Sequence, residues 1–122
     1  MPWTVEDHLG DKSERIRSLY DAFEVLISRC GRYERSVTKT AIAFKGQRRG
    51  FAGVTPRRAV LSGFLDLPEE VREPPFTRVS AYTKTLWVHR FVLKSLDDLD
   101  EAFAARVAQA YAVGQGARAV QP

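Results

Sequence analysis

Polar side chains that could do chemistry gather in two parts of the sequence. The first part is Ser36 to Leu67, three short runs that favour strands, separated by turns rich in glycine, proline and arginine. The second part is the alternating run from Thr85 to Leu93. Arginines beside an aromatic ring can bind phosphates and stack on planar bases. The candidate ligand-binding residues are therefore Lys39, Arg49, Trp87, His89 and Arg90.

A plainer interpretation of the same residues stays open. In it, Trp87 belongs to the core, His89 is packed, and Arg48, Arg49, Arg57 and Arg58 are solvated turn residues. A continuous basic strip would need Lys39, Arg90 or Lys84 on the same sheet face, and Lys39 and Arg90 decide whether the open face is charged. The pairs Arg48–Arg49 and Arg57–Arg58 flank one short strand, so they lie roughly 20 Å apart and cannot line one compact pocket.

Residues for catalysis or metal binding are scarce. The chain has two histidines and one cysteine, which are too few for a zinc site without many carboxylates. It contains no phosphate loop, dinucleotide-binding motif or nucleophile elbow. The acids between Asp97 and Glu101 crowd the start of a helix, where the helix dipole favours them. We expect no metal site and no cofactor, and an enzyme is the least favoured class.

Charge divides the chain into three parts. Residues 1–28 contain six acids and three bases, residues 29–94 contain fourteen bases and five acids, and residues 95–122 contain four acids and two bases. The predicted sheet region is therefore basic and the flanking helices are acidic. This pattern favours either a basic face for an anionic partner, nucleic acid or an acidic protein surface, or a mixed surface that only maintains solubility.

Hydrophobic spacing predicts the elements. Helices are expected over Val5–Leu9, over Glu14–Cys30, and from Ser95 to about Gly114, with Cys30 as a small core residue and His8 on the surface. Strands are expected over Ser36–Lys45, Phe51–Thr55, Ala59–Leu67 and Thr85–Leu93, and Val79–Tyr82 forms either a short strand or a loop. The predicted core consists of Leu19, Phe23, Ile27, Ile42, Phe44, Phe103 and Val107.

These elements predict an α+β fold. We expect an antiparallel sheet of four to five strands, with the N- and C-terminal helices packed on one face and a partly open, basic second face. One domain spans residues 1–116, and residues 117–122 form a mobile C-terminal tail. No apolar run approaches the roughly 20 residues that span a bilayer, and the start lacks a signal-peptide core. We therefore expect a cytoplasmic protein without membrane contact, either monomer or homodimer.

Five segments carry a family resemblance: SVTKTAIAFKG, RRGFAGVTPR, LDLP, WVHRFVL and SLDDLDEAF. With them, the chain resembles an uncharacterised bacterial family of small domains of unknown function. Such domains occur alone or at the C-terminus of predicted-transport or nuclease-like proteins. The resemblance covers about Trp3 to Gly116 and implies no catalytic residue.

Three function classes follow from the residues. The favoured class is a small non-catalytic binding module that uses a basic sheet face for an anionic partner. The alternatives are a structural domain that self-associates and an enzyme acting on a small anionic substrate. Salt dependence separates the first two, because phosphate binding weakens steeply as salt rises.

Overall fold

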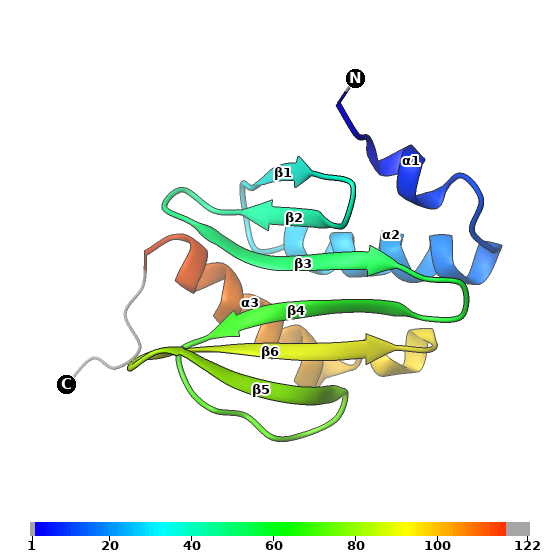
Figure 1. Ribbon diagram of the computed structural model, residues 1–122. Helices are drawn as coiled ribbons and strands as arrows, with labels where there is room; N and C mark the ends of the chain where they lie inside the picture. The colour runs from blue at the N-terminus through cyan, green and yellow to red at the C-terminus, as the bar shows by residue number, and fades with distance from the viewer. Residues whose placement is uncertain (1, 117–122) are drawn as a thin grey trace.

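The computed structural model describes residues 2–116, which form one antiparallel sheet and three α-helices (Figure 1). The predicted tail, residues 117–122, lies outside the described residues. The elements in chain order are α1 (Val5–Leu9), α2 (Glu14–Ser28), β1 (Glu34–Val37), β2 (Ile42–Lys45), β3 (Gly50–Pro56), β4 (Leu61–Leu67), β5 (Phe76–Thr83), β6 (Leu86–Leu93), a 3₁₀ turn (Leu96–Asp98) and α3 (Glu101–Gly114).

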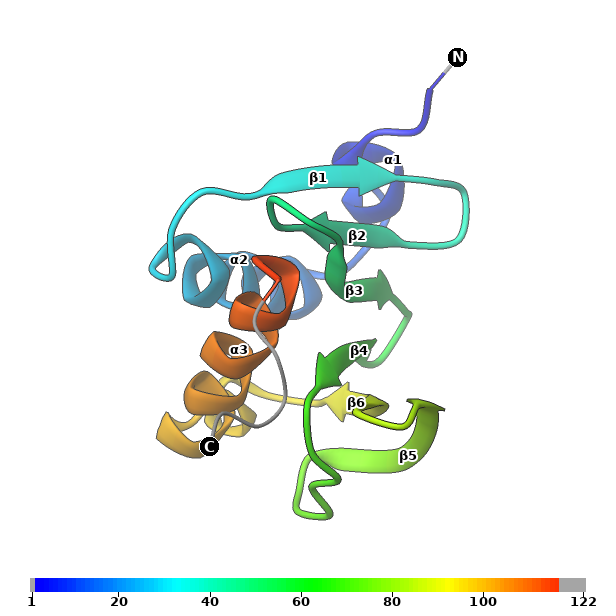
Figure 2. The same ribbon diagram turned by 90° about the vertical axis from the view of Figure 1, so that its left-hand side faces the viewer.

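The six strands lie in the order β1-β2-β3-β4-β6-β5, and every neighbouring pair is antiparallel. The helices α2 and α3 pack on one face, which is the far face in Figure 1 and the left side of the sheet in Figure 2. Neither of these long helices covers the other face, here called the open face. The predicted α+β class, with N- and C-terminal helices, is confirmed.

The sheet has six strands rather than the predicted four to five. The expected strand over Ser36–Lys45 is broken by a turn, in which the Thr38 N–H donates to the Ala41 carbonyl at 2.9 Å. The Thr38 hydroxyl oxygen also accepts weak hydrogen bonds from the N–H groups of Thr40 and Ala41, at 3.4 and 3.3 Å. Such local bonds compete with strand pairing. The segment therefore folds into the hairpin β1–β2.

The segment Val79–Tyr82 is part of a full strand. It belongs to β5, which pairs with β6 along most of its length and forms one edge of the sheet. Two register shifts interrupt this pairing, one between Phe76 and Arg78 and one between Ala81 and Thr83. These bulges explain why alternation in the sequence gives only a weak strand signal there.

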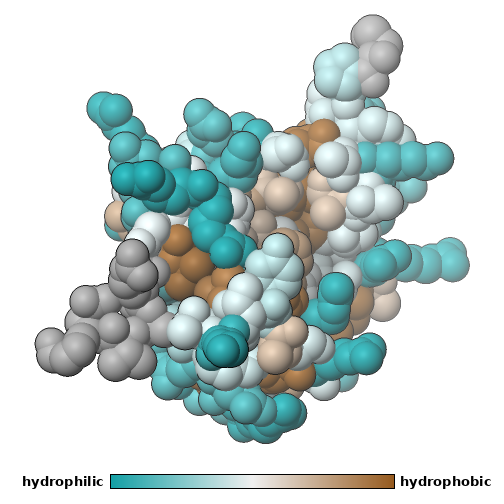
Figure 3. All heavy atoms as spheres, turned by 60° about the vertical axis from the view of Figure 1, so that its left-hand side comes forward, coloured by the Kyte–Doolittle hydropathy of each residue, from teal (hydrophilic) through white to brown (hydrophobic). Residues whose placement is uncertain are grey.

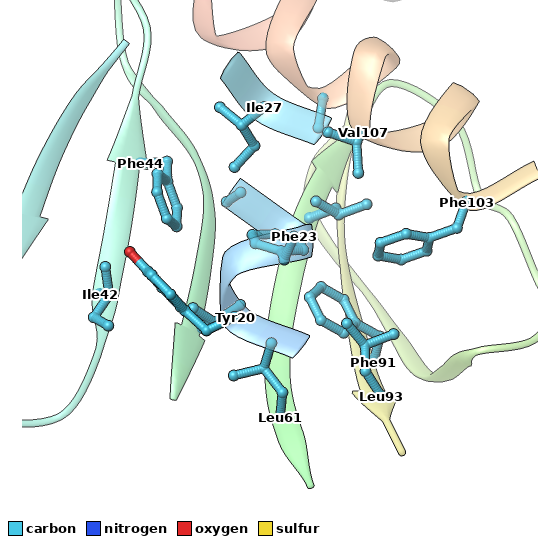
Figure 4. Packing of buried hydrophobic residues seen from close by; sticks show 14 of the residues in the cluster. Tyr20, Phe23, Ile27, Ile42, Phe44, Leu61, Phe91, Leu93, Phe103 and Val107 are labelled. Carbon is cyan, nitrogen blue, oxygen red and sulfur yellow. The ribbon is translucent and has the colours of Figure 1, made fainter. Parts of the chain in front are cut away.

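The core lies between the helices and the inner face of the sheet (Figure 4). Phe23 of α2 sits at its centre, and its ring centroid lies 5.8, 5.7 and 6.3 Å from those of Phe44, Phe91 and Phe103. All seven predicted core residues are at most 1% exposed and belong to one cluster, as predicted.

Helix ends follow local capping, with small corrections. The α1 helix has its predicted bounds, and its Thr4 hydroxyl accepts from the Asp7 N–H at 3.1 Å. His8, expected at the surface, is buried, and its Nε2 donates to the Thr38 carbonyl at 2.7 Å. The last helix begins at Glu101 rather than just after Ser95, because Asp100 caps it by accepting from the Phe103 N–H at 2.9 Å.

The turn between β2 and β3 rests on the end of α3. The Gly114 carbonyl accepts from the N–H groups of Arg48 and Arg49, at 2.9 and 3.2 Å. The Gln115 side chain accepts from the Gln47 N–H at 2.8 Å. The last turn of a helix leaves free carbonyl groups, and this turn satisfies one of them. The contact fixes the backbone from which Arg49 projects.

No helix within residues 2–116 is long and apolar enough to cross a membrane.

Candidate functional site

A row of residues crosses the open face at its centre. Gly53 of β3 lies opposite Phe64 of β4, which lies opposite Arg90 of β6, which in turn lies opposite Arg78 of β5. Directly opposite residues of antiparallel strands project from the same face. The row therefore joins one aromatic ring to two exposed arginines.

The glycine in this row makes room for the ring. A Cβ atom at Gly53 would lie 2.5 Å from Cε1 of Phe64, far inside van der Waals contact. The ring of Phe64 therefore lies across the β3 backbone. Its partial burial leaves some of its surface facing solvent on the open face.

Beside this row the open face is hollowed by a depression of about 310 Å³, here called the open-face hollow. Its lining combines cationic, aromatic, aliphatic and acidic side chains from the β2–β3 turn, β4, β5 and β6. The lining residues are Arg49, Phe64, Asp66, Tyr82, Val88 and Arg90.

An ion pair lies in the hollow. Arg49 Nη2 donates to Asp66 Oδ2 at 2.8 Å, and the Arg49 guanidinium carbon lies 5.7 Å from the centroid of the Tyr82 ring, which allows a cation–π contact. The second oxygen, Asp66 Oδ1, is buried and has no hydrogen-bond partner among the described residues. Burial raises the pKa of Asp66, and the nearby Arg49 only partly opposes this shift.

Positive charge dominates the strands that carry the hollow. In β3, β4, β5 and β6 the one acidic residue is Asp66, and it is already paired with Arg49. Arg78 and Arg90 face each other across β5 and β6, and within residues 2–116 neither forms an ion pair with a carboxylate. Like charges placed directly opposite destabilise a sheet, so this arrangement favours an anion between them.

A family model described as a domain of unknown function (DUF5655) matches residues 5–114. The chain belongs to this family. The match confirms the resemblance to a family of uncharacterised domains. The comparison with curated proteins and the comparison with solved structures found no match. The side chains that line the open-face hollow are therefore the evidence for what it binds.

Two of the five predicted site residues meet in this DUF5655 domain. Arg49 and Arg90 both line the open-face hollow. Lys39 is exposed in the turn between β1 and β2, outside the strands, and both β3 and β4 separate that hairpin from the strand that carries Arg90. The structure does not place Lys39 on a continuous strip with Arg90.

Trp87 and His89 project toward the inner face, where they lie opposite Leu67 and Leu65 of β4. His89 is fully buried. Its Nε2 accepts from the Val71 N–H at 2.9 Å, so Nδ1 carries the proton and donates to the Trp87 carbonyl at 3.1 Å. Burial lowers the pKa of His89, which favours the neutral ring that this bonding requires. In this structure His89 holds the loop after β4 against the sheet.

The other four residues that line the hollow are Phe64, Asp66, Tyr82 and Val88. None of them was among the five ligand-binding residues predicted from the sequence. Alternation in β4 and β6 does place Phe64, Asp66, Val88 and Arg90 on the faces opposite the core residues. What the sequence lacks is a signal that β4 and β6 are neighbours, because β5 lies between them in the chain.

Cys30 follows α2 and is partly buried. Its thiol lies 3.4 Å from the Leu26 carbonyl, and burial raises its pKa. A reactive cysteine needs the opposite shift. Within residues 2–116 no group of three or more histidine, cysteine, aspartate or glutamate side chains is arranged to hold a metal ion.

A larger hollow, of about 830 Å³, lies at the end of the sheet near the β2–β3 turn. Arg32, Lys45 and Arg48 line it together with Glu34. Figure 3 turns this side of the molecule forward, and hydrophilic side chains project around a smaller hydrophobic surface. This hollow adds positive charge at the same end of the sheet as Arg49.

Proposed function

We propose that this chain is a non-catalytic binding module whose open sheet face holds an anionic partner, and that single-stranded nucleic acid is the partner class. The observation that carries the proposal is the pair Arg78 and Arg90, which lie directly opposite each other on neighbouring strands. An anionic group between them would turn a repulsive contact into an attractive one.

Aromatic side chains on the same face favour nucleic acid over an acidic protein surface. Phe64 lies beside Arg90 in the central row, and Tyr82 is 64% exposed at the edge of the hollow. Unstacked bases bind by stacking on exposed aromatic rings and on arginine planes, while cations hold the phosphates. The carboxylates of an acidic protein could form ion pairs with the arginines, but they would not stack on the aromatic rings.

The shape of the site favours a single strand over a duplex. The open face is a sheet surface whose hollow of about 310 Å³ is near the small end of ligand pockets. Splayed bases of a single strand can lie against such a surface, whereas a duplex hides its bases. A small basic sheet domain with helices behind it can present this surface on a backbone that does not move.

The test is binding of fluorescent single-stranded DNA and RNA oligonucleotides, followed by anisotropy at several salt concentrations. We expect affinity to fall steeply as salt rises, because phosphate contacts release counterions. The double variant Arg78→Ala, Arg90→Ala should bind all sequences more weakly and flatten the salt slope by about 2, one for each lost phosphate contact.

The matched control is Arg29→Ala, which removes one exposed arginine next to the end of α2 on the helical side of the molecule. This variant should bind like wild type. The single variant Arg90→Ala is measured beside this control. The proposal fails if no oligonucleotide binds at low salt, or if Arg29→Ala weakens binding as much as Arg90→Ala does.

A further inference from the structure

The carboxylate of Asp66 is unusual because it is buried although its side chain lies on the open side of the sheet. Its side chain is 8% exposed, and Oδ1 has no hydrogen-bond partner among the described residues. Buried polar atoms in proteins are nearly always hydrogen-bonded, and each exception calls for an explanation. The other oxygen, Oδ2, accepts one hydrogen bond from Arg49.

This carboxylate has spare acceptor capacity. Each carboxylate oxygen can accept two hydrogen bonds, so Oδ1 can accept two and Oδ2 one more while it stays paired with Arg49. A ligand that completes the site must therefore offer two N–H or O–H donors side by side. An anionic ligand group would instead be repelled by Asp66 and would bind at the arginines.

The surroundings of Asp66 define the rest of the ligand. Phe64 and Val88 give the hollow apolar walls, Tyr82 gives it an exposed ring, and Arg90 gives it a cation. A planar body that carries two donors on one edge and is linked to a phosphate fits all of these features. Such a body is a nucleobase within a strand.

The donor pattern selects among the bases. Guanine presents its N1–H and its exocyclic amino group next to each other, which matches the two oxygens of a carboxylate. In adenine and cytosine the amino group lies beside a ring nitrogen that accepts, and that nitrogen would face a carboxylate oxygen. The N3–H of uracil lies between two carbonyl groups, which would also face acceptors.

We propose that the open-face hollow is a subsite for one guanine of a single strand, with Asp66 accepting from its N1–H and amino groups. This inference rests on the proposed function. The exposed Tyr82 is the side chain that turns to admit the base, while Arg49 stays paired with Oδ2 of Asp66. Arg90 and Arg78 then lie beside the strand to bind its phosphates.

The experiment compares short oligouridines that carry one central guanosine, adenosine, cytidine or inosine. We expect the guanosine strand to bind roughly tenfold more tightly than the adenosine and cytidine strands, in line with the usual value of a two-bond base contact. Inosine keeps N1–H but lacks the amino group, so its strand should bind with intermediate affinity. This comparison uses the wild-type protein and needs no folded variant.

The protein side of the test is Asp66→Asn, which keeps the shape of the side chain. Removal of its negative charge can raise the affinity for every strand, so the ratio of guanosine to adenosine affinity is the quantity to measure. We expect this ratio to fall to near one. The control Asp21→Asn makes the same chemical change on an exposed position of α2 and should leave the ratio unchanged.

The outcomes separate the two proposals. Binding of every strand with equal affinity, or a guanosine preference that survives Asp66→Asn, overturns the guanine subsite and leaves the binding module standing. No binding to any strand at low salt overturns the binding module itself.

Discussion

The surroundings of Asp66 disfavour the charged form of its carboxyl group. Burial raises its pKa above the ordinary value of 3.8, and Arg49 only partly offsets that shift. The folded protein therefore binds a proton at Asp66 more readily than the unfolded chain does. This group's contribution to the free energy of unfolding must decrease as pH rises through the raised pKa.

The corresponding prediction concerns Asp66→Asn, measured by thermal unfolding at several pH values. The stability of the variant relative to wild type should increase as pH rises from below 3.8 toward neutrality, because only wild type acquires the buried charge. If the stability of the variant relative to wild type decreased over the same pH range, the prediction would be wrong. The attraction of Arg49 would then outweigh burial and lower the pKa of Asp66. Asp21→Asn, an exposed change of the same kind, is the reference.

The contact between the β2–β3 turn and the end of α3 fixes the position of the Arg49 backbone. A Cβ atom at Gly46 would lie 2.6 Å from the carbonyl carbon and oxygen of Gly114. Gly46→Ala must push the turn away from the helix and weaken the bonds to the Gly114 carbonyl. We expect a loss of about 1–3 kcal/mol in the free energy of unfolding, as for other overpacked sites.

Gly50→Ala is the matched control for this prediction. The nearest atom to a Cβ at Gly50 is the Phe44 carbonyl oxygen at 3.8 Å, which is ordinary contact. Urea unfolding of both variants should leave Gly50→Ala close to wild type. Equal stability of the two variants would mean that the turn does not depend on the end of α3.

Alternation in single strands could be read from the sequence, but adjacency between strands could not. The inner and outer faces of β4 and β6 follow from the alternation of residues such as Leu65 with Asp66 and His89 with Arg90. Which strands become neighbours depends on packing between segments that are distant in the sequence. No local sequence pattern therefore predicts that Arg49 contacts Asp66 and Tyr82. The break at Thr38 was missed because local side-chain bonds outweighed strand propensity there.

The whole molecule depends on one aromatic core between sheet and helices. Phe23 contacts the rings of Phe44, Phe91 and Phe103, which come from β2, β6 and α3. Phe23→Ala should lower the free energy of unfolding by about 3–5 kcal/mol, a large part of the stability of a domain of this size.

Chemical denaturation checks this value against Val25→Ala, a change on the same helix at a position that is 44% exposed. Val25→Ala should stay within about 0.5 kcal/mol of wild type, as surface changes usually do. A Phe23→Ala protein as stable as the Val25→Ala protein would contradict the central place of Phe23 in the core.

The docking of the β2–β3 turn on Gly114 also orders events during synthesis on the ribosome. The hairpin β2–β3 leaves the exit tunnel early, but the carbonyl that receives the N–H groups of Arg48 and Arg49 is made near the end of the domain. Phe103 and Val107 of α3 complete the core at the same late stage. Until α3 emerges, α2 alone covers the inner face of the nascent sheet, and the part of that face on which α3 packs stays exposed. A pause in translation before Glu101 would prolong the exposure of this apolar surface to chaperones.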